Sequence, residues 1–192
     1  EDMIYKMQAA QYEWVRITLE LYRRNKWFSS GVIFWMLNDC WPASGSWSLI
    51  DYYGTPKAAY YAFKRAAKNV ICSINCKNEK CGFFVSNDSL NKFSGKMTIY
   101  ALYKDEIYKE ETDFSVGENT IRLVFETGKF NSLINDGAFL VCDIYGENFC
   151  DRAFYTIGLI SDANVNFAKP EIYERDEKSV TVFSKGLSVF VN

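Results

Sequence analysis

Histidine is absent from this 192-residue chain, and proline occurs only three times. Without imidazole, the Ser-His-Asp and Cys-His forms of nucleophilic catalysis are excluded. A zinc site would need cysteine or carboxylate ligands alone. No uninterrupted apolar run reaches about 18 residues, so the sequence predicts no transmembrane helix. We therefore expect no metal, no cofactor and no membrane association.

The chain also lacks an excess of charge of either sign. It has 22 lysine and arginine residues against 24 aspartate and glutamate residues, mixed along the sequence. Nucleic-acid-binding domains typically carry a basic patch, so nucleic acid is not an expected partner. A hydrophobic content of 48% is typical of a globular protein, whereas an aromatic content of 17% is high and needs an explanation.

The six cysteines do not follow a clear metal-binding pattern. They are Cys40, Cys72, Cys76, Cys81, Cys142 and Cys150. The spacing from Cys72 to Cys81 is looser than that of a structural zinc knuckle. We favour buried free thiols, with a disulfide near Cys142 and Cys150 as the alternative.

Residues 3–24 have the periodicity of an amphipathic helix. Apolar side chains recur at spacings of three and four along one face, at Met3, Met7, Ala10, Trp14, Ile17 and Leu21. Opposite charges recur at similar spacings, in Glu13–Arg16, Glu20–Arg23 and Glu20–Arg24. We expect Trp14 to be a core residue and these ion pairs to lie on the outer surface.

The run Val32–Leu37 predicts a strand with two apolar faces, as in a parallel sheet covered by helices. A second helix is predicted from about Pro56 to Asn69, with Thr55 as its N-cap and Pro56 as its first residue. Its inner face is expected to carry Ala59, Phe63, Ala66 and Val70, with Tyr60 and Tyr61 also in the core. The backbone N–H and C=O groups of one buried parallel strand need partners on neighbouring strands, so these residues are interpreted as a piece of a larger sheet.

From Ile71 onward, short apolar or alternating segments are separated by turn residues, which is typical of an antiparallel β-sandwich. These segments are CGFFVSN, KMTIYALYK, NTIRLVFE, AFLVCDIY and RAFYTIG. The last residues, 161–192, contain SVTVFS and LSVFVN and are expected to begin a further, truncated β domain.

Several separated signatures in the first 70 residues follow one another in a recognisable order. They are WMLNDCWP at 35–42, SWS at 46–48, DYYG at 51–54, and Pro56-Lys57 followed by Tyr60-Tyr61. The pattern resembles the end of the (β/α)8 barrel of glycoside hydrolase family 2, especially its β-mannosidase branch. The resemblance covers residues 3–68. The following segment is similar to the family's immunoglobulin-like domain only in its position and in its pattern of short predicted strands.

The resemblance implies two parts for residues 1–160. Residues 1–70 would be a helix–strand–helix fragment that carries barrel strand 8. Residues 71–160 would be an antiparallel immunoglobulin-like β-sandwich, which makes the whole an α+β composite. Barrel active sites lie at the carboxyl ends of the strands, and the resemblance places Trp35 there as the floor of the subsite for the terminal sugar.

Each expected sugar contact has a structural alternative. The resemblance implies that Trp35, Asn38, Asp39 and Trp41 bind the substrate. Trp35 lies in an apolar run, where core packing also explains it. Asn38 and Asp39 often shape loops through bonds to the backbone. Packing within the loop is the alternative for Trp41.

No catalytic residue is assigned in the chain. Retaining glycosidases need two carboxylates about 5 Å apart, and the resemblance puts both upstream of residue 1. Asn78-Glu79 copies the Asn-Glu pair of the family's acid/base motif, but it lies beyond the barrel and is interpreted as a loop charge.

The predicted function follows from these expectations. The parent protein would be a retaining exo-glycosidase that acts on terminal β-linked mannose, with carbohydrate as its partner. The isolated chain would be inactive, and its uncovered barrel surface would make it self-associate. One alternative is another family 2 exo-enzyme, an exo-β-glucosaminidase or β-galactosidase. The other is a non-catalytic carbohydrate-binding sandwich, which a row of Tyr100, Tyr103 and Tyr108 on one strand face would support.

Overall fold

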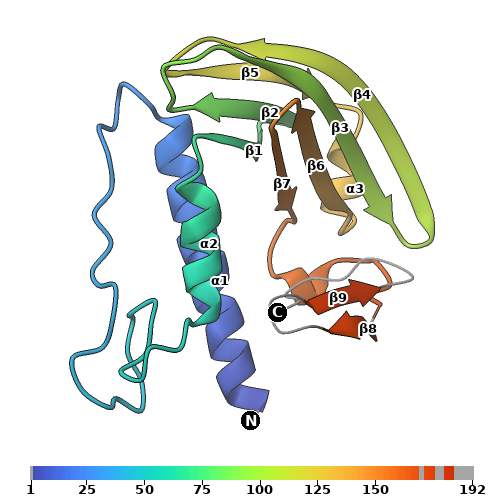
Figure 1. Cartoon of the computed structure of the whole chain (residues 1–192). Coiled ribbons are helices and arrows are strands. Elements are labelled where there is room, and N and C mark those ends of the chain that lie inside the picture. The colour runs from blue at the N-terminus through green and yellow to red at the C-terminus, as the bar shows by residue number, and fades with distance from the viewer. Residues whose placement is uncertain (1, 169–170, 176–179, 184–192) are drawn as a thin grey trace.

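The computed structural model describes residues 2–168, 171–175 and 180–183. Two long helices come first, and two antiparallel sheets follow (Figure 1). The helices are α1 (Asp2–Arg24), α2 (Ala58–Ala66), α3 (Asn131–Asn135) and the 3-10 turn η1 (Ile160–Asp162). The strands are β1 (Val70–Lys77), β2 (Lys80–Asn87), β3 (Phe93–Tyr103), β4 (Glu106–Val116), β5 (Thr120–Thr127), β6 (Phe139–Gly146), β7 (Phe149–Tyr155), β8 (Glu171–Arg175) and β9 (Val180–Phe183).

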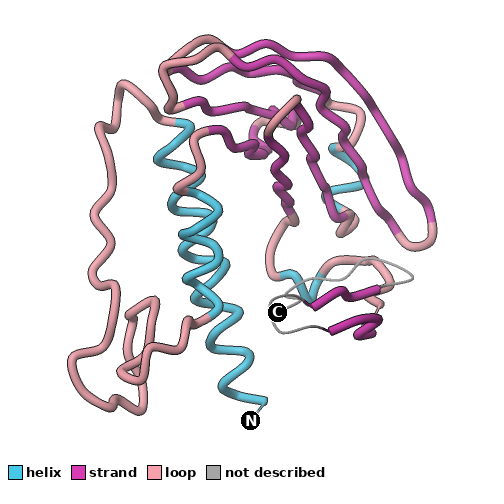
Figure 2. Tube along the Cα trace, in the orientation of Figure 1, coloured by secondary structure: helices cyan, strands magenta, loops and turns pink. Residues whose placement is uncertain are grey.

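Helices α1 and α2 lie side by side and run in the same direction (Figure 1). The long segment 25–57 returns from the end of α1 to the start of α2, and Figure 2 shows it as an open loop away from the sheets. The sequence predicts the order helix, strand, helix for the first 70 residues, and of these three elements the two helices are confirmed.

The predicted strand Val32–Leu37 is not formed. Residues 31–37 have no helical or strand assignment, and the side chains of Ile33, Trp35 and Leu37 are exposed. A strand needs a partner for its backbone N–H and C=O groups, and among the described residues no second parallel strand lies beside this segment. The apolar segment is therefore present without the sheet that would make it a strand.

Helix α1 buries a different face from the one that the apolar stripe predicts. The stripe is exposed: Met3 is 71% exposed, Met7 59%, Trp14 62% and Ile17 51%. The buried apolar positions are Val15 and Leu19, which pack on Leu49 and on the alanines of α2. Trp14 is therefore not a core residue of this chain. Its stripe is uncovered because α2 and the sandwich occupy the other side of α1.

Helix α2 is shorter than predicted. It begins at Ala58, and the backbone N–H of Ala58 donates to Oε1 of Gln8 at 3.1 Å. Thr55 is not its N-cap, because the Thr55 N–H donates to the Asp51 carboxylate in a turn before the helix, and Pro56 precedes the first helical residue. Three predicted inner residues are confirmed, since Ala59 and Ala66 are buried and Phe63 is partly buried. Val70 is buried too, but as the first residue of β1 in the sandwich core and not as part of the helix. Tyr61 is the exception, at 48% exposed.

The sandwich contains one three-stranded sheet, in the order β1-β2-β5, and one four-stranded sheet, in the order β4-β3-β6-β7. All pairs are antiparallel. Every second residue of the central strands points into the space between the sheets, as strand geometry requires. In β3 these residues are Met97, Ile99 and Ala101, and in β6 they are Leu140, Cys142 and Ile144.

The five predicted segments coincide with β2, β3, β5, β6 and β7, whereas β1 and β4 were missed. Strand β4 has the sequence EIYKEETDFSV, in which charged residues hide the alternation. It is an edge strand that pairs only with β3. An edge strand of this kind forms through its neighbour, and its charges discourage pairing with other chains.

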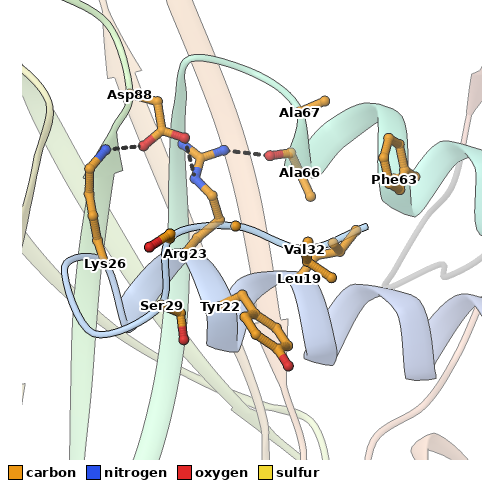
Figure 3. Close-up of a pocket in the computed structure, with 12 residues that line it drawn as sticks. Leu19, Tyr22, Arg23, Lys26, Ser29, Val32, Phe63, Ala66, Ala67 and Asp88 are labelled. Carbon is orange, nitrogen blue, oxygen red and sulfur yellow. Dashed lines mark hydrogen bonds and ion pairs between the residues drawn. The ribbon is translucent and has the colours of Figure 1, made fainter. Parts of the chain in front are cut away.

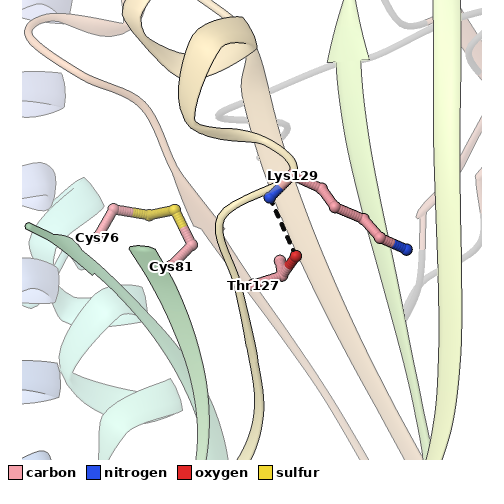
Figure 4. Close-up of a disulfide and its surroundings, with 4 residues drawn as sticks. All are labelled: Cys76, Cys81, Thr127 and Lys129. Atoms are coloured by element: carbon pink, nitrogen blue, oxygen red, sulfur yellow. Dashed lines mark hydrogen bonds between the residues drawn. A yellow bond between two sulfur atoms is a disulfide. The ribbon is translucent and has the colours of Figure 1, made fainter. Parts of the chain in front are cut away.

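A disulfide joins Cys76 and Cys81 across the β1–β2 hairpin (Figure 4). The two cysteines face each other in the register, each one residue from the end of its strand next to the turn. The hairpin turn consists of Asn78 and Glu79, both with positive φ, as two-residue hairpin turns require. Asn78-Glu79 is therefore a turn, in agreement with its interpretation as a loop charge.

The disulfide near Cys142 and Cys150, which the sequence leaves as the alternative to free thiols, is not formed. Cys142 is a buried free thiol and Cys150 is an exposed one. In the β6–β7 register Cys142 faces Ala153, and Cys150 faces Tyr145, so the two sulfurs belong to different rows of the sheet. Cys72 is a second buried free thiol, and burial raises its pKa above the ordinary value.

Strands β8 and β9 form a separate antiparallel pair after the sandwich. They lie within residues 161–192, for which a further β domain stays a prediction. The segment LSVFVN lies outside the described residues. The division of the chain at residues 70 and 160 stays a prediction.

A buried ion network joins the helices to the sandwich. Arg65 of α2 donates to the Glu20 carboxylate at 2.5 Å and, through two nitrogens, to Asp151 of β7 at 3.0 and 2.8 Å. Arg16 donates to Glu20 at 3.3 Å and to the carbonyl of Phe154 at 2.9 Å. Burial alone would lower the pKa of Arg65, but the two carboxylates raise it above the ordinary value.

The expectation of surface ion pairs on α1 is therefore wrong at Glu20, which is only 2% exposed. The face of α1 that carries Glu20 packs against the sandwich. Arg23, expected to pair with Glu20, instead donates to the carbonyls of Lys68 and Asn69 and pairs with Asp88 at 3.0 Å.

Candidate functional site

Trp35 lies at the end of the apolar segment, with 76% of its surface exposed. The peptide bond from Trp35 to Met36 is cis. The neighbour before it, Phe34, is partly buried and packs with Trp14 and Phe63. Phe34 thus holds the segment on the helix pair, while the indole of Trp35 is open to a ligand or to another part of a protein.

The segment after Trp35 turns back on itself through backbone hydrogen bonds. The N–H groups of Leu49 and Ile50 donate to the carbonyl of Leu37, at 3.1 and 2.9 Å. The N–H of Asp39 donates in return to the carbonyl of Ile50 at 3.1 Å. Residues 38–50 therefore form a closed loop whose two ends are joined just beyond Trp35.

A third segment and α1 anchor this loop. The N–H of Lys57 donates to the carbonyl of Leu49 at 2.8 Å. The Gln11 side chain of α1 donates to the carbonyls of Trp47 and Ser48, at 2.9 and 3.3 Å. The loop is thus fixed to the first half of α1 and to the start of α2.

A cluster of polar side chains fills the loop. The Lys57 ammonium donates to the hydroxyls of Ser46 and Ser48, at 2.9 and 2.7 Å, and to the Asp39 carboxylate at 3.3 Å. The Ser46 hydroxyl also donates to Asp39. Hydrogen bonds from the Ser46 and Ser48 hydroxyls, together with the charge of Lys57, lower the pKa of Asp39 below its ordinary value.

The predicted sugar-binding residues do not share one environment. Asp39 is 5% exposed, and both of its carboxylate oxygens have partners within the loop. Asn38 is exposed, and its amide nitrogen donates to the carbonyl of Asp39 at 3.1 Å. Trp35 and Trp41 are exposed, Trp41 at 66%. The two indoles are accessible, the two polar side chains order the loop, and sugar contacts by any of the four stay a prediction.

The chain has a cavity of about 240 Å³, but it lies away from Trp35. It is between the ends of α1 and α2 and residues 29–32 (Figure 3). Its charged residues are Arg23 and Lys26, which both pair with the third, Asp88. Gln11, which anchors the loop, precedes Arg23 by about 18 Å along α1, from the rise of an α-helix. The cavity therefore belongs to the opposite end of the helix pair.

The described residues contain no group of three or more cysteine, aspartate or glutamate side chains placed to hold a metal ion. No described helix is long and apolar enough to cross a membrane. The lack of an assigned catalytic carboxylate stays a prediction from the resemblance.

Comparisons with known proteins point to one group of enzymes, although no family model matches the chain. A β-mannosidase B of Thermothelomyces thermophilus is 38% identical over 71 residues, which are 34% of this chain and 8% of that protein. An exo-β-D-glucosaminidase of Amycolatopsis orientalis is 34% identical over 124 residues, 60% of this chain and 12% of that protein. The crystal structure of a β-D-mannosidase from Dictyoglomus thermophilum superimposes with a TM-score of 0.77 and 28% identity.

The chain is homologous to part of the family 2 β-mannosidases and exo-β-D-glucosaminidases. The match to the Dictyoglomus thermophilum structure covers 93% of this chain and 22% of that one. The chain thus spans roughly a fifth or less of the length of these family 2 relatives. The similarity includes the helices and the sandwich together, because it covers nearly the whole chain.

Ser46, Ser48 and Lys57 lie within the signatures that resemble family 2, but the sequence predicts no role for them. The signal was present, because Lys57 is a positive charge close behind a loop that contains Asp39 and two serines. What sequence could not supply is the chain reversal that brings position 57 to position 39.

The tyrosines proposed for a carbohydrate-binding sandwich do not form a row. In the β3–β4 register Tyr108 faces Ala101, a core position, whereas Tyr100 alternates with the core residues Ile99 and Ala101. Tyr100 and Tyr108 therefore point to opposite faces of the sheet, and Tyr103 has the parity of Tyr108. This observation gives the binding-module alternative no support.

Proposed function

We propose that this chain is the C-terminal part of a retaining exo-glycosidase that hydrolyses terminal β-linked mannose. The observation that carries the proposal is the similarity to a β-D-mannosidase structure over 93% of the chain, at a TM-score of 0.77. Sequence identity of 38% to a named β-mannosidase over 71 residues supports the same substrate class.

In this proposal residues 1–70 complete a (β/α)8 barrel whose other strands belong to the rest of the protein. Segment 31–37 would become strand 8 and gain its neighbours there. Two features of the chain support this role: segment 31–37 is apolar but unpaired, and the apolar stripe of α1 is uncovered. Both are expected of a barrel piece, since parallel strands and their helices are buried on both sides.

Trp35 has a defined role in the proposed reaction. It would stand at the carboxyl end of strand 8, where barrel enzymes place their active sites. The face of its indole would lie against the C–H face of the terminal sugar and help to hold the sugar in its distorted shape. The rest of the protein would supply two carboxylates about 5 Å apart as nucleophile and general acid/base.

A second candidate is an exo-β-D-glucosaminidase. The alignment with the Amycolatopsis orientalis enzyme covers 60% of this chain, a larger share than the 34% aligned with the Thermothelomyces thermophilus β-mannosidase. We place it second because its structures superimpose less closely, with a TM-score of 0.65 against 0.77.

The proposal is tested by assaying the full-length protein that contains this chain on three aryl glycosides. We expect hydrolysis of the aryl β-mannoside, with weaker or no hydrolysis of the β-glucosaminide and the β-galactoside. The isolated 192-residue chain should give background rates on all three. Preference for the β-glucosaminide would favour the second candidate, and activity of the isolated chain would contradict the assignment of the carboxylates to the rest of the protein.

A further inference from the structure

The Lys57 ammonium is the centre of the loop that follows Trp35. Its three hydrogen-bond acceptors are the two serine hydroxyls and the Asp39 carboxylate, all between 2.7 and 3.3 Å from the nitrogen. An ammonium group has three donors, so the coordination is complete. The side chain of Lys57 is 16% exposed and that of Asp39 is 4% exposed, which makes this a largely buried pair.

This cluster joins three stretches of chain that would otherwise separate. Asp39 stands just after the apolar segment, Ser46 and Ser48 stand on the returning arm, and Lys57 immediately precedes α2. The backbone bonds from Leu49 and Ile50 to Leu37 close the loop two residues beyond Trp35. The position of Trp35 relative to α1 and α2 therefore depends on the same contacts that Lys57 completes.

Removing one member of a buried ion pair lowers the stability of the fold more than removing both members does. Without Lys57, Asp39 would keep its charge in a site with little access to water, and the hydroxyls alone would have to stabilise it. The loop would relieve that cost by opening, so that Asp39 reaches water. Opening would release the carbonyl of Leu37 and with it the ordered start of the loop.

We propose that Lys57 is a positioning residue that holds the loop 36–51, and through it Trp35, in the geometry needed for sugar binding. The proposal deepens the proposed function and rests on it for the sugar. Lys57 touches no substrate in this role. It acts through Asp39, Ser46 and Ser48 on the backbone that carries the indole.

The first test measures the loop without using activity. In the full-length protein, hydrogen–deuterium exchange followed by mass spectrometry would compare wild type with Lys57→Met and with Lys64→Met. Lys64 is an exposed lysine of α2, and it serves as the matched control. We expect Lys57→Met to speed exchange in peptides from residues 36–51 while peptides from β3 and β6 keep their wild-type rates. Unchanged exchange in 36–51 overturns the proposal.

A double variant separates positioning from a general loss of stability. Asp39→Asn removes the uncompensated charge and keeps an oxygen acceptor for Ser46. We expect Lys57→Met/Asp39→Asn to recover slow exchange in 36–51 relative to Lys57→Met alone. Equal exchange in the single and double variants contradicts the charge-based reason. Faster exchange throughout the sandwich would show that Lys57 supports the fold in general, and would also overturn the proposal.

The second test uses kinetics on an aryl β-mannoside. Lys57→Met should lower kcat/KM per folded molecule about 10- to 100-fold, because small displacements of a positioned group have effects of that size. Lys64→Met should leave it unchanged, and the double variant should regain part of the loss. If wild type hydrolyses no glycoside, the proposed function fails, while the exchange experiment still decides whether Lys57 holds the loop. Normal kinetics for Lys57→Met, with altered exchange, would show that the loop does not position the sugar.

Discussion

Two tryptophans, Trp14 and Trp35, show how little a single residue's sequence context says about its surroundings. Both lie in apolar patterns, and both are exposed in the chain, at 62% and 76%. Trp14 was expected in the core and instead is exposed, with a ring contact to Phe34 at 6.4 Å between centroids. Trp35 was expected to face a sugar, and its open indole is compatible with that role.

The first prediction concerns Trp35 in the full-length protein. Trp35→Ala should lower kcat/KM for an aryl β-mannoside about 10- to 1,000-fold, equivalent to about 1.4 to 4 kcal/mol of transition-state stabilisation. The reason is that the indole would hold the distorted sugar before the oxocarbenium-like transition state. Steady-state kinetics, corrected for the folded fraction by a melting curve, measure the effect.

Trp14→Ala is the matched control for Trp35→Ala. It should leave kcat/KM per folded molecule near the wild-type value. In the isolated chain it should cost about 1 kcal/mol or less, because Trp14 is mostly exposed there and loses one aromatic contact. If Trp35→Ala lowers only the melting temperature, Trp35 is a packing residue and its sugar-facing role is wrong.

At the scale of the element, α1 has two faces with different surroundings. One carries apolar and charged residues and is packed, and the other is apolar and exposed. One face packs on α2 through Val15, Leu19 and Glu20 and on the sandwich through Arg16. The other carries the exposed stripe that includes Met7 and Ile17. An apolar stripe of this length on an isolated helix face is typical of an interaction surface. In the proposed parent protein the rest of the barrel covers it.

The second prediction follows for the isolated chain. Its exposed stripe should cause self-association that increases with concentration, and Ile17→Glu should shift the chain toward monomer. Leu90→Glu is the control, since Leu90 is an 82% exposed apolar residue in the loop between β2 and β3. Sedimentation velocity across a wide concentration range distinguishes the cases. A clean wild-type monomer throughout would count against an interaction surface on α1.

At the scale of the whole molecule, charged groups join the helices to the sandwich. Arg65 links three elements, because it donates to Glu20 of α1, Asp151 of β7 and the carbonyl of Cys72 in β1. Arg16 adds a guanidinium that lies 4.0 Å from the ring centroid of Phe154. The similarity to known structures also spans both parts, which agrees with a fixed arrangement of helices and sandwich.

The third prediction is that Arg65→Met destabilises the protein strongly. It leaves Glu20 and Asp151 buried with fewer positive partners, and breaking a buried pair of this kind costs about 3 to 5 kcal/mol. Lys80→Met is the control, because Lys80 of β2 and Glu126 of β5 form an exposed pair that should contribute about 1 kcal/mol or less. Urea unfolding measured by circular dichroism gives both values. Equal effects of the two substitutions would contradict a structural role for the network.

Local sequence patterns were sufficient to predict an element where that element is stabilised by its immediate neighbours in the sheet. The five predicted strands of the sandwich formed because their alternation fits a sheet that the chain itself completes. Strand β4 escaped prediction because its charges suit an edge, and only its pairing with β3 makes it a strand. The disulfide was likewise decided by the hairpin register, which places Cys76 opposite Cys81.

The sequence by itself determined the two helices, the antiparallel sandwich and the relation to family 2 glycosidases, since periodicity and signature residues are local properties of the chain. Only the tertiary structure decided which face of α1 is buried, that segment 31–37 is unpaired, and that Lys57 reaches Asp39. Burial, strand pairing and buried ion pairs depend on what lies on the other side of each group. The fold of the whole chain decides which group lies there, and the residues adjacent in sequence do not.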